Sequence, residues 1–111
     1  MSAIIENLER LLNDGQENAL LRFSLGNAYL DLDANQAIVH LERAIELDNG
    51  YSAAWKLLGK AQAVAGAMDN AIETYTKGIA IAEEKGDIQA SKEMTVFRKR
   101  LLKEKEQKDS I

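Results

Sequence analysis

The chain has 111 residues, enough for one domain of ordinary size, and contains neither cysteine nor proline. Without cysteine there is no disulfide framework, thiol nucleophile or thiolate metal site, which suits a reducing compartment, so we expect a cytoplasmic protein. The net charge of −4 is unevenly spread, because residues 1–84 carry 6 basic and 13 acidic side chains whereas residues 85–111 carry 8 and 5.

Residues 1–14 form the first predicted helix. Its apolar residues Ile4, Leu8 and Leu11 repeat at helical spacing, which leaves one wet face. Acidic residues interrupt the apolar pattern, and no apolar run approaches the roughly 18 residues needed to span a bilayer. The segment is therefore interpreted as an amphipathic helix, and we expect no association with membranes.

Residues 51–85 have the pattern of two antiparallel helices joined by a tight turn. A large ring suits the space between two such helices, while glycine and alanine let the backbones approach closely. The segment places these residue types at Trp55, Leu58, Gly59, Ala71, Tyr75 and Gly78. The pattern favours a helical hairpin with Trp55 in its core.

Residues 17–50 carry the same pattern 33 residues earlier in the sequence. The matching positions are Arg22, Leu25, Gly26, Tyr29, Ala37, Leu41 and Ala44. A period of this length is typical of stacked repeats. At these residues the sequence resembles the tetratricopeptide repeat, whose pattern is W-x-x-L-G-x-x-Y, then A-x-x-x-F, then A and P. We refer to residues 17–50 as repeat one and to residues 51–85 as repeat two.

Both repeats depart from the family pattern at a few positions. Repeat two has Gln62 in the tyrosine slot and Glu83 in the proline slot. Repeat one is one residue shorter in its turn and has Arg22, Leu41 and Asn49 in the slots for tryptophan, the second aromatic residue and proline. Turns absorb such a deletion more easily than packed helices do.

The resemblance implies an all-α fold, a right-handed stack of helical hairpins with about six helices. In its register, the helix of residues 1–14 is the second half of a preceding hairpin and covers one end of the stack. Residues 87–105 carry a single apolar stripe suited to closing the other end. We therefore expect one domain over residues 1–105, made of the capping helix 1–14, repeats one and two, the capping helix 87–105, and a frayed tail at 106–111.

Nothing in the sequence favours catalysis, so we expect no enzyme, no cofactor and no metal site. His40 is the only histidine and lacks cysteine partners, so we expect an ordinary, partly exposed side chain. The glycines fall at repeat slots and helix ends, and no phosphate-binding loop of the form G-x-x-x-x-G-K-[ST] occurs.

The resemblance instead implies a protein-binding scaffold. In the family, the first helices of successive hairpins line a concave groove, and residues between the packing slots hold a peptide or extended segment. Apolar anchors and hydrogen-bond donors in these positions fit a partner with an acidic or carboxylate-ended segment. The carboxylate clamp of some relatives draws on three repeats, so we do not expect it here. The predicted groove residues are Phe23, Asn27, Leu30, Lys56, Lys60 and Val64.

Two alternatives remain open from the sequence. The apolar groove residues are also compatible with a cover formed by a terminal helix or a second copy, so the chain is alternatively a structural homodimer or an adaptor subunit of a larger assembly. The C-terminal helix also predicts weak nucleic-acid binding, although Glu104 and Glu106 interrupt its basic cluster. That cluster comprises Arg98, Lys99, Arg100, Lys103, Lys105 and Lys108.

Overall fold

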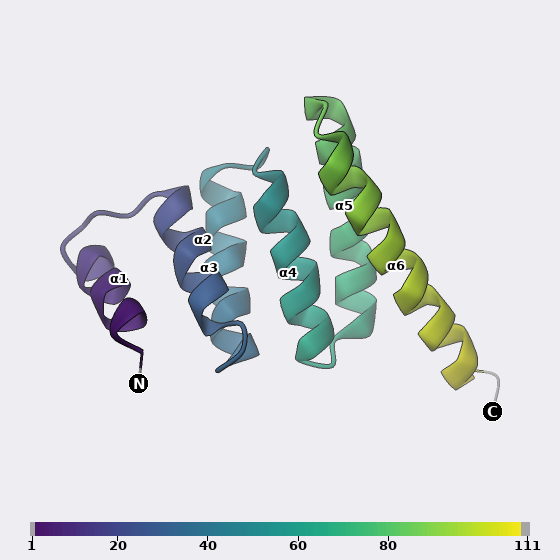
Figure 1. The fold of residues 1–111 in the computed structure, drawn as a ribbon, viewed down its shortest axis with the longest axis horizontal. Helices are drawn as coiled ribbons and strands as arrows, with labels where there is room; N and C mark the ends of the chain where they lie inside the picture. The colour runs from purple at the N-terminus through teal and green to yellow at the C-terminus, as the bar shows by residue number, and fades with distance from the viewer. Residues whose placement is uncertain (1, 110–111) are drawn as a thin grey trace.

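The computed structural model describes residues 2–109, and over this range it contains helices and no strand (Figure 1). The helices are α1 (Ala3–Asn13), α2 (Ala19–Tyr29), α3 (Ala34–Leu47), α4 (Ser52–Val64), α5 (Met68–Lys85) and α6 (Ile88–Asp109). None of these helices is long and apolar enough to cross a membrane. The predicted all-α fold is confirmed.

The helices form a flat, elongated stack of 49 × 33 × 18 Å. The first and second helices of the two hairpins, α2 with α3 and α4 with α5, pack against each other, and α3 also packs against α4. Figure 1 shows α2, α4 and α6 in a front layer, α3 and α5 behind them, and the two termini at opposite ends of the long axis. The front layer defines the face on which the groove was predicted.

Both hairpins are held at a close crossing where glycine faces a large side chain. A Cβ atom placed on Gly26 would lie 2.5 Å from Leu41 Cγ, and one placed on Gly59 would lie 2.6 Å from Tyr75 Cζ. Leu41 and Tyr75 occupy the same slot of the repeat pattern. The two copies of the hairpin therefore share one packing device, in which only glycine leaves room for the side chain opposite.

Trp55 lies in the core, as its slot in the repeat predicts. Its side chain is 8% exposed, and its Cβ packs so closely on α5 that a Cβ on Gly78 would meet it at 2.9 Å. The indole Nε1 donates a hydrogen bond of 2.8 Å to the Asn49 carbonyl oxygen, so the one polar atom of the ring is satisfied.

Polar side chains begin the helices at the hairpin junctions. The Asn18 side chain accepts a hydrogen bond of 2.8 Å from the Leu21 amide at the start of α2. At the turn before α6, the Asp87 carboxylate accepts hydrogen bonds from the Ser52 hydroxyl and the Ala90 amide, which lower the pKa of Asp87. This turn is thereby fastened to the start of α4.

The C-terminal helix extends further than expected. The frayed tail predicted at 106–111 is wrong for residues 106–109, which continue α6 to Asp109; residues 110–111 lie outside the described part of the chain. The sequence showed no apolar stripe in this stretch, but Lys105 Nζ lies 2.9 Å from a carboxylate oxygen of Asp69 at the start of α5. Lys105, the last residue of the predicted capping helix, is thus paired with α5, and α6 continues for one further turn.

Candidate functional site

The candidate site lies on the face formed by α2, α4 and α6 (Figure 1). α6 was predicted only as a cap, yet its buried residues show that it packs like the first helix of a further hairpin. Ala90 and Met94 are buried against α5 at the same spacing as Ala54 and Leu58 in α4. The face that α4 presents to the groove therefore continues onto α6.

A pocket of about 310 Å³ opens between α4 and α6. Its floor is apolar and partly aromatic, because the rings of Tyr75 and Phe97 lie against each other with centroids 5.9 Å apart. Burial raises the pKa of the Tyr75 hydroxyl to about 12, so the floor stays neutral at physiological pH. The pocket is lined by Lys60, Ala63, Val64, Tyr75, Phe97, Arg100 and Leu101.

The rim of this pocket is basic. Lys60 and Arg100 line it and are exposed, and neither forms an ion pair within the part of the chain that the structure describes. Three more exposed lysines, Lys92, Lys99 and Lys103, lie four residues before and three and seven residues after Val96, so they share one side of α6. Cations over an apolar floor suit a ligand that combines a carboxylate with an apolar side chain.

Lys56, a predicted groove donor, is already engaged. Its Nζ lies 2.8 Å from a carboxylate oxygen of Glu93 on α6, with side chains that are 35% and 40% exposed. The pair joins α4 to α6 across the groove. Lys56 therefore differs from Lys60, whose ammonium group has no carboxylate partner among the described residues.

The α2 end of the face is less open than predicted. Leu30 is only 7% exposed and belongs to the core, so its prediction as a groove anchor is wrong: it follows the last residue of α2, and its side chain packs in the core cluster. Phe23 is half-buried against the Tyr51 ring, with centroids 5.0 Å apart. Asn27 is exposed, and Val64 is 60% exposed at the pocket.

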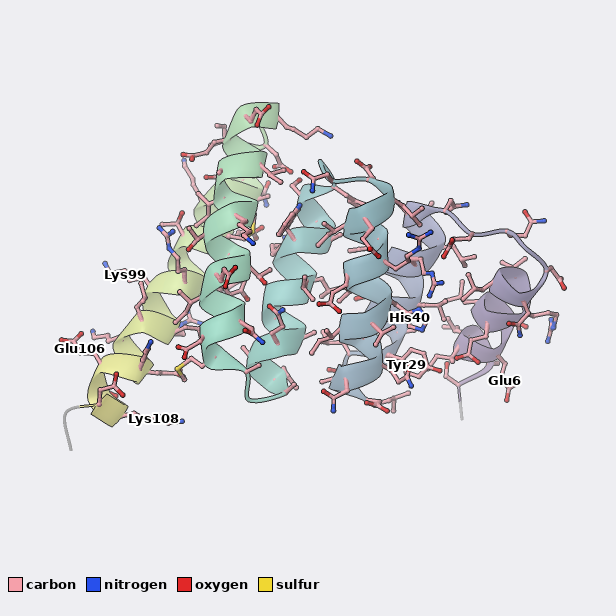
Figure 2. The ribbon with its side chains drawn as sticks, turned by 180° about the vertical axis from the view of Figure 1, so that it is seen from behind. Glu6, Tyr29, His40, Lys99, Glu106 and Lys108 are labelled. Atoms are coloured by element: carbon pink, nitrogen blue, oxygen red, sulfur yellow. The ribbon has the colours of Figure 1, made fainter. Side chains whose placement is uncertain are left out.

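A polar cluster lies between α1, α2 and α3, away from the pocket. Arg22 Nη1 donates a hydrogen bond of 3.0 Å to His40 Nδ1, and the Tyr29 ring stacks on His40 with centroids 5.6 Å apart (Figure 2). The Tyr29 hydroxyl donates a hydrogen bond to Glu9 on α1, and this contact raises the pKa of Tyr29. The expectation that His40 is partly exposed is wrong: it is buried, and burial lowers its pKa.

Arg22 also connects this cluster to an ion-pair network at Glu17. Glu17 accepts hydrogen bonds from Arg43 and Arg22, and these cations hold the pKa of the Glu17 carboxyl at about 2. No group of three or more histidine, cysteine or acidic side chains with metal-binding geometry occurs among residues 2–109. We interpret the cluster as a structural substitute for tryptophan in repeat one, because Arg22 occupies that slot.

Phe97, Arg100 and Leu101 are the α6 residues of the pocket that sequence reasoning missed. Phe97 and Leu101 were assigned to a capping stripe, and Arg100 only to a basic cluster. The spacing of Ala90, Met94 and Phe97 was the signal that could have identified α6 as a first-type helix.

No family model matches the chain. The TPR repeat-containing protein PA0015 of Pseudomonas aeruginosa is 52% identical over 99 residues, which cover 88% of this chain and 94% of that protein. The solution structure of protein BPP2914 from Bordetella parapertussis is 42% identical, with a TM-score of 0.82 over 94% of this chain and 91% of that one. A tetratricopeptide repeat domain protein from Salinibacter ruber is 29% identical, with a TM-score of 0.71 over 77% and 87%.

These similarities extend over 77% to 94% of the chain and agree with the repeat slots found in the sequence and the hairpins found in the structure. Proteins with this repeat generally mediate protein–protein interactions and are generally scaffolds without enzymatic activity. The chain belongs to the tetratricopeptide repeat family.

Proposed function

We propose that the chain binds an extended segment of a partner protein on the face formed by α2, α4 and α6. The segment places an apolar side chain in the pocket between α4 and α6 and a carboxylate against Lys60 and Arg100. The pocket is the observation that carries this proposal, because it combines an apolar floor with two exposed cations that lack a carboxylate partner among the described residues.

The polarity of the face supports a definite orientation of the partner. The α4 and α6 end carries the basic side chains, whereas the α2 end presents Phe23, Asn27 and the 64% exposed Leu20. The acidic part of the partner segment would lie over α6, and its neutral part would lie over α2. Charge placed in this way favours correct register and rapid encounter more than raw affinity.

The binding surface is already formed in the free protein, so the protein loses little conformational entropy on binding. The pocket floor is fixed by Tyr75, which is buried at the glycine crossing of repeat two, so the domain orders little when the segment binds. The partner segment loses most of the conformational freedom. Moderate, salt-sensitive affinity is therefore expected.

The test uses short synthetic peptides, each with one leucine or phenylalanine beside two or three acidic residues, and matched peptides in which amides replace the acids. Fluorescence polarisation measures their binding to the full chain. We expect the acidic peptides to bind, the amide peptides to bind at least about tenfold more weakly, and the difference to shrink with added salt.

The variant Lys60→Glu with Arg100→Glu should abolish this preference. Its matched control is Lys77→Glu, which reverses an exposed charge on α5 outside the pocket lining. Equal binding of acidic and amide peptides, or unchanged binding by the double variant, contradicts the proposal.

A further inference from the structure

The outer side of α1 is an apolar stripe on which no other helix of residues 2–109 packs. α1 has the register of a second helix, and Ile4, Leu8 and Leu11 occupy the slots that face the first helix of a hairpin. Their counterparts on α3 are Ala37, Leu41 and Ala44, and each of these is 0% exposed. Ile4 is 64% and Leu11 46% exposed, because α1 packs on α2 alone among the described helices. Terminal repeats normally present a polar outer face.

The opposite end of the stack has the converse arrangement. α6 packs as a first helix, and Ala90 and Met94 face α5, but no second helix within residues 2–109 covers its outer side. Ile88 and Leu102, which are 56% and 47% exposed, recur with Thr95 at intervals of seven residues, so they share one side of α6. The two ends of the molecule therefore present the two halves of one hairpin.

The charges of these ends are opposite. α6 carries seven basic and four acidic side chains, a net charge of +3, whereas residues 2–14 carry three acidic and one basic, a net charge of −2. Figure 2 shows Glu6 at the α1 end and Lys99 and Lys108 at the far end of the long axis. Opposite charge at the two ends favours contact between different ends and disfavours contact between like ends.

We propose that the chain associates with further copies of itself head to tail, with α6 of one copy packed antiparallel on α1 of the next. The two helices then form the hairpin that each end lacks, and the stack continues from one molecule into the next. This inference goes beyond the proposed binding of a partner segment, because it uses the ends of the stack and leaves the pocket open.

The contact is weaker than the hairpins within the chain. Thr95 stands in the slot that Gly26 and Gly59 fill in the two repeats, so α6 cannot approach a second helix as closely. A head-to-tail contact also does not close on itself, and each added copy leaves one free end of each kind. The expected behaviour is growth that depends on concentration and does not stop at a dimer.

Sedimentation velocity of the full chain from about 10 μM to about 1 mM tests this behaviour, since it covers weak association. The average mass should rise through that range without a plateau at twice the monomer mass. Leu11→Glu blocks the α1 end and Leu102→Glu blocks the α6 end, and each variant alone should remain monomeric. Circular dichroism checks that both keep their helices, and Ile4→Lys replaces Leu11→Glu if that variant loses them.

Mixing the two blocked variants identifies the geometry. The open α6 of Leu11→Glu should bind the open α1 of Leu102→Glu, and the mixture should form a one-to-one dimer and nothing larger. Val39→Glu, a control at an exposed residue of α3, should associate like the unmodified chain. A monomer at every concentration overturns the proposal. A Leu102→Glu variant that still dimerises by itself also overturns it, because that result indicates contact between two α1 helices.

Discussion

The tryptophan slot of the repeat pattern holds an aromatic residue in repeat two and a charged residue in repeat one. In repeat two, the buried ring of Trp55 packs on α5 and its single polar atom bonds to the Asn49 carbonyl. In repeat one, Arg22 takes that slot and bonds to Glu17 and His40. The hairpin thus accepts a charged residue in this position, and no buried side-chain nitrogen or oxygen atom of residues 2–109 lacks a hydrogen-bond partner. We therefore expect the Trp55 slot to contribute through packing and the Arg22 slot to contribute through hydrogen bonds that depend on the protonation of His40.

Replacing Trp55 with alanine should have the largest effect on the fold. The change removes a buried ring and leaves a cavity beside Gly78, which should reduce the free energy of unfolding by about 3 to 5 kcal/mol. Arg22→Ala should cost clearly less, because Arg43 still holds Glu17. Urea unfolding of both variants measures the two losses of free energy of unfolding. Equal losses would contradict the view that Trp55 acts through packing and Arg22 through polar contacts.

Adding a methyl group at the two glycine crossings should have the next largest effect. Gly59→Ala should cost about 1 to 3 kcal/mol through overpacking, beyond the helix-propensity gain of about 1 kcal/mol. Gly26→Ala should cost less, because the Leu41 side chain can change rotamer whereas the Tyr75 ring is rigid and buried. Thermal unfolding shows which variant is less stable. Stabilisation by both substitutions would contradict the close approach of the helices at Gly26 and Gly59.

Repeat one should lose stability first on acidification. Burial and Arg22 lower the pKa of His40, so the folded state binds this proton less readily than the unfolded chain does. The contribution of neutral His40 is complete above its ordinary pKa of about 6.5 and is lost as the pH falls below that value. Hydrogen exchange at pH 7.5 and pH 5.5 should show α2 and α3 losing protection before α4 and α5.

His40→Gln supplies the control for this dependence. The variant should have a flatter profile of stability against pH over the same range, whatever its stability at pH 7.5. Protection that rises in α2 and α3 at the lower pH would contradict the assigned direction of the shift.

Repeat two was the more predictable half from the sequence. Its slots are filled by the residue types whose size determines the crossing, so Trp55, Gly59 and Tyr75 could be placed from their spacing alone. Repeat one and the groove depended on contacts between distant residues. No local pattern links Lys56 to Glu93, which are 37 residues apart, or Arg22 to His40. The end of α6 was predicted four residues too early, because residues 106–109 carry no apolar stripe.

Breaking the Lys56–Glu93 pair should have the smallest effect. Both side chains are more than a third exposed, so a double-mutant cycle with alanine should give a coupling energy below about 1 kcal/mol. We therefore expect this pair to contribute little to the stability of the fold. A coupling of several kcal/mol would indicate that α6 is held to α4 mainly by this contact.

The direct test of the account is to follow an isotope-labelled chain by NMR while an acidic, leucine-containing peptide is added. The largest chemical-shift changes should fall on Lys60, Phe97 and Arg100 around the pocket of α4 and α6. Residues on the outer side of α3, such as Val39, should not respond. Changes centred on α3 and α5, with the pocket residues unaffected, would contradict the proposed binding face.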